Sequence, residues 1–230
     1  MTLRAVTFDV YSALYDAPTG LARGLAPVLR QRGVAGDPHA VARSWRHKQR
    51  EYLLIANSLG LEPASNRKAI EASVRYTLRG LEPPVTPDEL RALVDAWEDL
   101  PPWPEAAAVL EEVRRRRLVL ATLSNGDEEM LRRLVANTLA VSFDYVISTE
   151  GGRFKPHPSA YQRALETLAV ERKELLHVAG GAPDAMGATA FGIQTVWVNR
   201  AADAVVDSRY APAYQVGDLR GVLEVLDSLR

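Results

Sequence analysis

The second half of the chain alternates apolar runs of strand length with amphipathic segments of helix length, and this alternation restricts the fold more than any other feature. Strands are predicted at 118–123, 143–148, 175–179 and 195–198, and helices at 105–115, 127–139, 159–169, 184–191 and 219–229. Strands that alternate with helices pair in parallel through right-handed crossovers. The sequence therefore predicts an α/β fold, a doubly wound parallel sheet with helices on both faces.

An apolar run near the N-terminus ends in a single acid, Asp9. Val6 and Phe8 fit a short buried strand of the same sheet, so Asp9 falls at the carboxyl edge, where open α/β sheets bind ligands. A carboxylate held there by backbone N–H groups stays ionised and can attack an electrophilic carbon or phosphorus. On this stretch alone, Asp9 could equally start a turn, with Ser12 and Asp16 as its polar members.

A long helical insertion separates this first strand from the rest of the sheet. From about Gly20 to Asp99 the periodicity is helical, and no strand is predicted. Helices are predicted at 21–29, from Asp37-Pro38 to Gly60, across 70–78, and from Thr86, which forms a capping box with Glu89. We therefore expect an α/β core domain made of residues 1–16 and 100–230, and a helical cap domain made of residues 17–99.

Composition narrows the classes of function. A length of 230 residues is ample for one large domain with an insertion. The formal net charge of -1 gives no bias toward nucleic acid or membrane, so a small-molecule partner is favoured. The absence of cysteine excludes disulfides and thiolate zinc sites. With no signal-peptide pattern and no apolar run long enough to span a bilayer, we expect a cytoplasmic protein.

Three further sheet-edge loops carry polar residues suited to one site. Ser124, Asn125 and Gly126 follow a predicted strand and precede a helix, so they predict an anion-binding corner, or else an ordinary helix cap. Lys155 stands before a proline, where a solvent-exposed lysine is the simpler interpretation. Asp184 follows a loop of small residues that would let backbone and ligand approach closely, although it could merely cap the next helix.

Taken together, these segments resemble the haloacid dehalogenase-like (HAD) hydrolase superfamily over essentially the whole chain. The detail is most similar to the L-2-haloacid dehalogenase branch. The first motif of that branch, Phe-Asp-x-Tyr-Gly-Thr-Leu-Phe-Asp, reads Phe8-Asp9-Val10-Tyr11-Ser12-Ala13-Leu14-Tyr15-Asp16 here, and its cap-helix motif, Trp-Arg-x-Lys-Gln-x-Glu-Tyr, reads Trp45-Arg46-His47-Lys48-Gln49-Arg50-Glu51-Tyr52. The match extends to Ser124-Asn125-Gly126, to Lys155-Pro156 with Tyr161, and to 191–200. The resemblance implies a Rossmann-like HAD core with a helical cap.

Tyr11 separates the dehalogenase branch from the phosphatases of the superfamily. Phosphatases place a second aspartate at this position because an alkoxide leaving group needs a general acid, whereas a departing halide needs no proton. The Gly180-Gly181 pair stands where phosphatases usually add an acidic magnesium ligand. With Asp9 and Asp184 as its only evident acidic ligands, a magnesium site would be weak, so we expect no metal and no cofactor.

The resemblance also implies a mechanism. Asp9 attacks C2 of a small anionic 2-haloacid to give an ester that water hydrolyses, while Arg46 binds the substrate carboxylate or the halide. Lys155 holds Asp9, Tyr161 buttresses Lys155, and Asp184 orients or activates water; Ser124 and Asn125 hydrogen-bond the substrate or the nucleophile. The implied catalytic residues are Asp9, Lys155, Asp184, Ser124 and Asn125, and the implied substrate-binding residues are Arg46, Tyr11, Val10, Tyr161 and His47. The simpler alternative for Arg46 is a surface ion pair with Glu51.

The chain departs from the pattern of the dehalogenase branch at several positions, including four in or beside the predicted site. Ala13, Ala179, Gly181 and Pro183 replace a threonine, a serine, an asparagine and a tryptophan. Two alternatives therefore stay open: a phosphatase that holds magnesium through Asp9 and Asp184, and a non-catalytic HAD-like binding protein. We expect no nucleic-acid or membrane partner, and the family resemblance suggests a homodimer.

Overall fold

The computed structural model describes residues 3–61 and 65–229, and its centre is a parallel sheet of six strands in the order β3-β2-β1-β4-β5-β6. The strands are β1 (Ala5–Phe8), β2 (Val119–Ser124), β3 (Tyr145–Ser148), β4 (Leu175–Ala179), β5 (Gln194–Val198) and β6 (Tyr214–Val216). The order reverses beside β1, which confirms the doubly wound sheet and places the end of β1 at the switch point. Strand β6 was not predicted, because three residues are too short to show a period.

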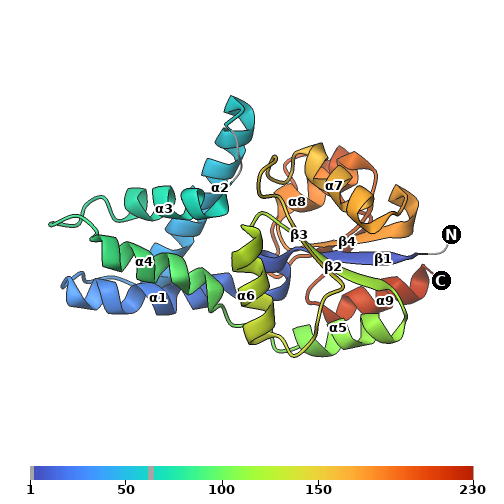
Figure 1. The fold of residues 1–230 in the computed structure, drawn as a ribbon, viewed down its shortest axis with the longest axis horizontal. Helices are drawn as coiled ribbons and strands as arrows, with labels where there is room; N and C mark the ends of the chain where they lie inside the picture. Colours follow the sequence, from blue (N-terminus) through green and yellow to red (C-terminus); the bar gives the residue numbers. More distant parts are fainter. Residues whose placement is uncertain (1–2, 62–64, 230) are drawn as a thin grey trace.

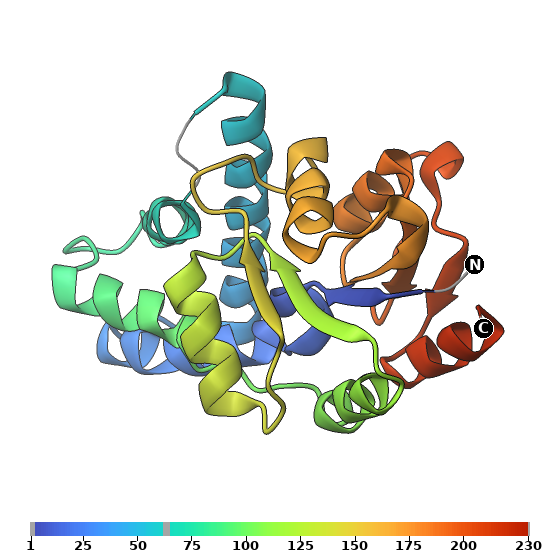
Figure 2. The ribbon, with the colours of Figure 1, turned by 45° about the vertical axis from the view of Figure 1, so that its right-hand side comes forward.

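Helices cover both faces of the sheet (Figures 1 and 2). On one face lie α5 (Ala106–Arg115), α6 (Glu128–Thr138) and α9 (Arg220–Ser228), and on the other lie α7 (Pro158–Leu168) and α8 (Ala182–Phe191). Side chains alternate along a strand, so Val6 and Phe8 of β1 pack in the main core toward α5, α6 and α9. Thr7 therefore faces α7 and α8.

A group of helices lies beyond the carboxyl edge of the sheet, at the left of Figure 1: α1 (Ala17–Gln31), α2 (Pro38–Leu59), α3 (Asn66–Thr77) and α4 (Pro87–Asp95). The local signals act as predicted: Asp37 caps α2, Gly60 ends it in the left-handed region, and Thr86 forms a capping box with Glu89. The chain leaves and re-enters the core where Tyr15 pairs with Pro102. The division into domains of residues 1–16 with 100–230 and 17–99 stays a prediction.

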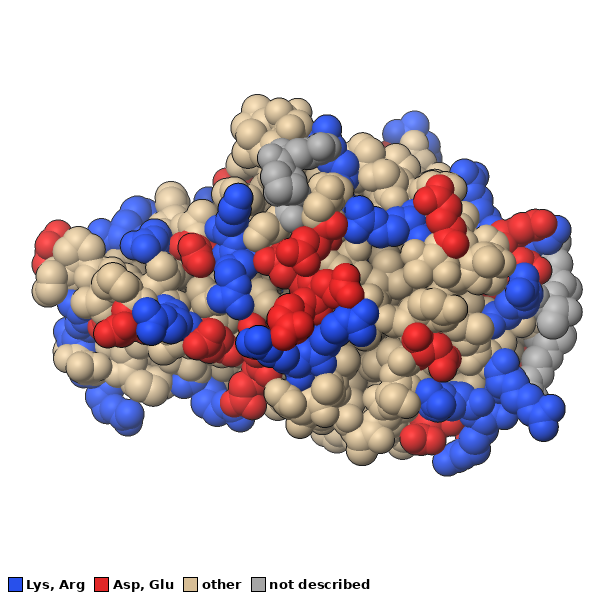
Figure 3. Space-filling model, viewed as in Figure 1, with Lys and Arg blue, Asp and Glu red and all other residues tan. Residues whose placement is uncertain are grey.

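On the face in Figure 3, basic and acidic side chains are interspersed, with no large area of one sign. Among residues 3–61 and 65–229, no helix is both long and apolar enough to cross a bilayer.

Candidate active site

Asp9 directly follows β1 and starts a π-helical turn, Val10–Leu14. Its Oδ2 accepts a hydrogen bond from the Ser12 backbone N–H at 3.0 Å, and its own N–H donates to the Val178 carbonyl of β4 at 2.9 Å. Gly180 packs against this turn so closely that an added Cβ would lie 2.2 Å from the Ser12 carbonyl carbon. Gly180 therefore lets the loop before Asp184 pack directly against the turn after Asp9, the kind of close backbone approach predicted for the small residues of this loop.

Lys155 is shared by two carboxylates. Its Nζ lies 3.1 Å from Asp9 Oδ1 and 2.6 Å from Asp184 Oδ2, and its side chain is only 3% exposed. Burial lowers the pKa of Lys155, but the charges of Asp184 and Asp9 raise this pKa by more than burial lowers it. The net shift of the pKa is therefore upward. Burial raises the pKa of Asp184, but interactions with Lys155 and then with His177 lower it by more than that. The pKa of Asp184 is therefore held well below its usual range. With both carboxylates ionised, the three groups carry one excess negative charge.

Asn125 acts on the backbone of Lys155. Its Oδ1 accepts from the Lys155 N–H at 2.6 Å and from Thr149 Oγ1 at 3.2 Å, and its Nδ2 donates to the Lys155 carbonyl at 3.0 Å. These bonds fix the loop that carries Lys155, while Asn125 also lines the cavity.

The backbone groups predicted to bind an anion after β2 form hydrogen bonds within the protein. The N–H of Glu128, at the start of α6, donates to Glu150 Oε2 at 2.8 Å, and Ser148 Oγ donates to the Gly126 carbonyl at 2.5 Å. Ser124 is completely buried, its hydroxyl has no hydrogen-bond partner among the described residues, and it does not line the cavity. The predicted hydrogen bond of Ser124 to a substrate or to the nucleophile stays a prediction.

His177, which was absent from the predicted site, contacts Asp184. It is fully buried on β4, with Nε2 3.1 Å from Asp184 Oδ2 and Nδ1 2.9 Å from Thr7 Oγ1. A carboxylate requires a donor, so we assign the proton to Nε2 and let the Thr7 hydroxyl donate to Nδ1. The available signal was a histidine and a threonine inside apolar strands, which their parallel pairing brings together.

Tyr161 contacts Asp184 and not Lys155, which corrects the predicted buttress. Its hydroxyl donates to Asp184 Oδ1 at 2.9 Å and to the Asp184 carbonyl at 3.1 Å, and the ring is fully buried and does not line the cavity. Lys155 and His177 engage Oδ2 while Tyr161 engages Oδ1. A carboxylate with donors on both oxygens is a weak base, so Asp184 is suited to holding charge and geometry.

Arg46 reaches from α2 to the turn that follows Asp9. Its Nη2 donates to Ser12 Oγ at 3.2 Å and its Nη1 to Gln49 Oε1 at 2.7 Å, and its guanidinium lies 5.0 Å from the centroid of the Trp97 ring. The alternative surface pair with Glu51 is wrong, because that carboxylate pairs with Lys48 at 2.6 Å.

Arg50, one helical turn after Arg46, was not among the predicted site residues. Its Nη2 lies 3.4 Å from Ser12 Oγ, and its side chain is exposed at the mouth of the cavity. Within the part of the chain that the structure describes, no carboxylate lies within 4.0 Å of Arg46 or Arg50. Burial lowers the pKa of Arg46, and the positive charge of Arg50 lowers it further. The negative charge of Asp9 raises this pKa but does not offset the other two effects. Both arginines therefore lack a carboxylate at ion-pair distance among these residues. Burial lowers the pKa of Arg50, and the charges of Asp9 and Asp203 oppose this from farther away.

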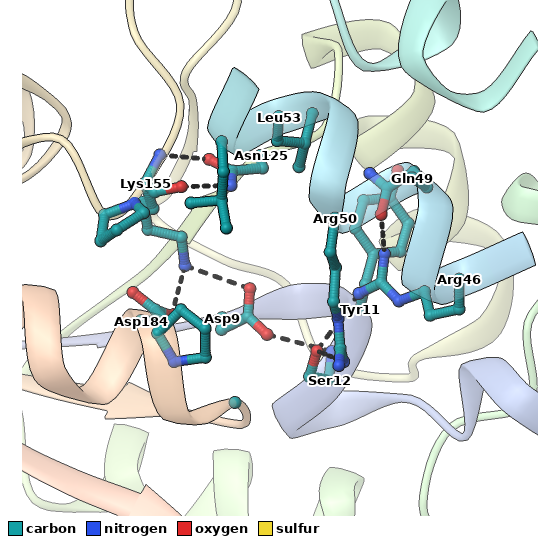
Figure 4. A pocket seen from close by; sticks show the side chains of 14 residues that line it. Asp9, Tyr11, Ser12, Arg46, Gln49, Arg50, Leu53, Asn125, Lys155 and Asp184 are labelled. Carbon is teal, nitrogen blue, oxygen red and sulfur yellow. Dashed lines mark hydrogen bonds and ion pairs between the residues drawn. The ribbon is translucent and has the colours of Figure 1, made fainter. Parts of the chain in front are cut away.

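These side chains enclose one cavity of about 80 Å³ (Figure 4). Its walls are Asp9, Tyr11, Ser12, Arg46, Gln49, Arg50, Leu53, Leu54, Asn125, Lys155, Pro156, Gly181, Pro183 and Asp184. Val10 is buried in the main core, and the His47 side chain is 76% exposed near Glu51, so neither predicted contact lines the cavity. His47 follows Arg46 on the same helix, and adjacent helical residues face different directions.

The donor set of the cavity does not suit a magnesium ion. Two carboxylates, Asp9 and Asp184, line it, and the Lys155 ammonium binds both. Magnesium prefers several oxygen ligands in octahedral geometry. Within residues 3–61 and 65–229, no group of three or more His, Asp or Glu side chains is placed to hold a metal ion.

The known proteins that this chain resembles include several haloacid dehalogenases. A model of the haloacid dehalogenase-like hydrolase family matches residues 3–192. The (S)-2-haloacid dehalogenase H-109 of Pseudomonas putida is 31% identical over 219 residues, which are 94% of this chain and 95% of that protein. The L-2-haloacid dehalogenase of Xanthobacter autotrophicus superposes with a TM-score of 0.86 at 28% identity, covering 100% of both chains. A structure of that enzyme with chloropropionic acid covalently bound superposes with a TM-score of 0.85 at 27% identity, again over 100% of both chains.

Proposed function

Because this chain belongs to the haloacid dehalogenase-like hydrolases, we propose that it hydrolyses the carbon–halogen bond of a small (S)-2-haloacid through an ester on Asp9. The observation that carries the proposal is the cavity, in which Asp9 is paired with Lys155 and lies beside Arg46 and Arg50, which have no carboxylate within 4.0 Å among residues 3–61 and 65–229. The test is halide release from the two enantiomers of 2-chloropropionate, measured by ion chromatography. Release from the (S) enantiomer is expected, and release from neither would remove the proposal.

In the first step a carboxylate oxygen of Asp9 attacks C2. The C2–O bond forms while the carbon–halogen bond breaks, and the halide leaves with the bonding electrons, so no proton has to be supplied. Lys155 on Oδ1 and the Ser12 N–H on Oδ2 fix the plane of the carboxylate and align it for attack.

In the second step water adds to the Asp9 carbonyl carbon and releases the 2-hydroxy acid and a proton. Negative charge develops on the former Asp9 carboxylate oxygen, where Lys155 or the Ser12 N–H already donates. We assign Asp184 to orienting Lys155 and the water, because its charge is held by three side-chain donors.

The two arginines of the cavity offset the negative charge that a substrate carboxylate would meet there. Asp9, Asp184 and Lys155 together carry one excess negative charge, so they repel a substrate carboxylate. Arg46 and Arg50 offset this repulsion, and a guanidinium can bind a planar carboxylate through two parallel hydrogen bonds. In this arrangement the helical segment of residues 17–99 acts as a cap that completes the active site.

Replacing Arg46 by lysine keeps the charge and removes the two-pronged geometry. We expect kcat/KM for 2-chloropropionate to fall by about 10- to 100-fold, since hydrogen bonds to charged groups contribute about 1.5–3 kcal/mol. The melting temperature should change little. Arg43→Lys is the matched control, because Arg43 lies on the same helix with its side chain 64% exposed. Parent-like turnover in both Arg46→Lys and Arg46→Ala would show that Arg46 has no role in the reaction.

We also propose that catalysis needs no divalent metal. Protein treated with EDTA should release halide at the rate of the untreated protein, and added magnesium should leave that rate unchanged. The reason is the donor set, in which the Lys155 ammonium already binds the two carboxylates that a metal would need. Magnesium-dependent release of phosphate from p-nitrophenyl phosphate, without halide release, would favour the phosphatase alternative.

We further infer a cytoplasmic homodimer that acts on a small anionic substrate and binds neither nucleic acid nor membranes. The mixed surface charge of Figure 3 and the formal net charge of -1 support a small-molecule partner over a polyanion. Light scattering coupled to gel filtration would test the dimer.

A further inference from the structure

A carboxylate of the α/β core binds the start of a helix in the cap, residues 17–99. Asp127 stands at the start of α6, where an aspartate ordinarily bonds the first N–H groups of its own helix, yet its side chain makes no such bond. Its Oδ1 accepts from the Asn66 N–H at 2.5 Å, and its Oδ2 accepts from Ser65 Oγ at 3.0 Å and from the Arg67 N–H at 3.2 Å. These residues begin α3, so Asp127 binds the positive end of a helix from a distant part of the chain.

This contact is shielded from water. Asp127 is 9% exposed and Asn66 is fully buried. A second link between α3 and α6 passes through Glu98, which lies 3.1 Å from Arg67 and 3.4 Å from Arg133, but these arginine side chains are 40% and 56% exposed. Exposed ion pairs contribute little, whereas a buried polar group that loses its partner is costly. The polar contact that holds α3 on α6 is therefore chiefly that of Asp127.

From Asn66 a chain of hydrogen bonds runs to Arg46. Asn66 Oδ1 accepts from Gln49 Nε2 at 2.5 Å, and Gln49 Oε1 accepts from Arg46 Nη1 at 2.7 Å. A guanidinium only donates, so Gln49 must turn its oxygen to Arg46 and its nitrogen to Asn66. The Gln49 side chain is buried, and water cannot replace either partner there. The place of Asn66 therefore decides where the Arg46 guanidinium lies.

The two ends of this chain reach the loops of the active site. Arg46 Nη2 donates to Ser12 Oγ at 3.2 Å, in the turn that follows β1 (Figure 4). Asp127 follows Asn125 closely in the sequence, and Asn125 fixes the backbone of Lys155. The chain therefore ties the guanidinium on α2 to the loops that position the nucleophile.

The far end of α2 is tied to the core separately. Asn57 lies about three helical turns after Arg46. Its Nδ2 donates to the Phe154 carbonyl at 2.7 Å, and its Oδ1 accepts from the Phe154 N–H at 3.0 Å. This contact holds the cap on the core by a route that does not pass through Gln49. Cutting the chain at Asp127 should therefore loosen Arg46 without detaching the cap.

We propose that Asp127 is a positioning residue for the reaction. It holds the start of α3 on the core, and the chain through Asn66 and Gln49 then sets the place of Arg46. The inference rests on the proposed function and deepens it, since Arg46 is the group that receives the substrate anion. Asp127 does not line the cavity and takes no part in the bond changes. Its effect is geometric, because a binding group displaced by about 1 Å can cost a large factor in rate.

The test is kcat/KM for halide release from (S)-2-chloropropionate. Asp127→Ala should lower it by about tenfold or more, chiefly through KM, because the substrate meets a misplaced guanidinium. Gln49→Met keeps the shape of the side chain, removes both of its hydrogen bonds and should act in the same direction. Asp127→Asn keeps one acceptor for α3, should show a smaller loss and serves if the alanine variant does not fold.

Two control variants separate positioning from a loss of stability. Asp37→Ala removes the carboxylate that accepts from two N–H groups at the start of α2. It should lower the melting temperature as Asp127→Ala does, yet leave kcat/KM close to the parent value. Arg133→Gln removes the exposed contact with Glu98 and should change neither. Losses of kcat/KM that follow the melting temperature across all three variants would overturn the inference.

A double-mutant cycle with Arg46→Lys decides whether Asp127 acts through Arg46. If it does, Asp127→Ala should lower kcat/KM by no more than about twofold in the Arg46→Lys background, against about tenfold in the parent. Equal factors in the two backgrounds, or an Asp127→Ala variant with the KM of the parent, would overturn the inference and leave the proposed function standing.

Calorimetry with propionate gives a readout that does not need turnover. If no halide is released from either enantiomer, binding weakened about tenfold by Asp127→Ala but not by Asp37→Ala still supports the positioning role. Equal binding by the parent and Asp127→Ala, or binding by neither, overturns it.

Discussion

Replacing Asp9 by asparagine is expected to abolish halide release, with kcat reduced by about four orders of magnitude or more, as is typical when a covalent nucleophile is removed. A neutral amide is a poor nucleophile, so the ester does not form. The carboxamide oxygen can still accept the hydrogen bond from the Ser12 N–H that Asp9 Oδ2 accepts at 3.0 Å. The fold should therefore persist, as circular dichroism would show.

Asp16→Asn is the matched control for this variant. Asp16 lies in the same stretch and caps α1, accepting from the Thr19 N–H at 3.2 Å, and asparagine is an equally good cap. The control should turn over like the parent. Steady-state halide release by Asp9→Asn near the parent rate would eliminate Asp9 as the nucleophile.

Replacing Lys155 by methionine is expected to reduce both activity and stability. Its Nζ holds Asp9 at 3.1 Å and Asp184 at 2.6 Å, so its removal leaves two buried carboxylates facing one another. Removing one partner of a buried ion pair costs about 3–5 kcal/mol of unfolding free energy. We expect kcat to fall by about 10²- to 10³-fold, since the nucleophile loses a fixed donor. Lys173→Met, at an exposed surface pair, is the control.

The loss of stability in Lys155→Met should depend on pH. In the parent the pKa of Asp184 is lowered, so its contribution to stability is present above the ordinary carboxyl pKa and disappears as the pH falls through the folded-state value. Without Lys155, burial favours the protonated acid, so the variant regains stability relative to the parent as the pH falls. Urea unfolding at neutral and acidic pH measures this difference, and a pH-independent gap would show that Lys155 does not hold the charge of Asp184.

Much of the fold was predictable because its signals are local. Asp37-Pro38 and Gly60 mark the ends of α2 within a few residues of sequence, and apolar strands alternate with helices through the second half of the chain. The position of Asp9 at the carboxyl edge of the sheet followed from the end of one apolar run, whereas its place at the switch point required the strand order. Lys155 pairs with Asp9, which is the contact that the resemblance implies.

The remaining parts of the site depend on contacts between distant segments. The contact between His177 and Thr7 requires the register of β1 against β4, which no local pattern gives. Glu150 accepts a hydrogen bond from the N–H of Glu128 at the start of α6, and this contact depends on the path of the loop after β3. Arg50 falls at a variable position of the cap-helix motif, so its approach to Ser12 became visible only once α2 was placed over the turn after β1.

The central claim is that the oxygen delivered to C2 comes from Asp9 and is replaced from water. A single turnover of (S)-2-chloropropionate, with protein in excess and in water enriched in the heavy oxygen isotope, tests this directly by mass spectrometry. Our account predicts a lactate that carries the ordinary isotope at C2, and a peptide containing Asp9 that has gained the heavy one. Heavy oxygen at C2 of the product, with an unlabelled Asp9 peptide, would mean that water attacks C2 directly and would contradict the ester mechanism.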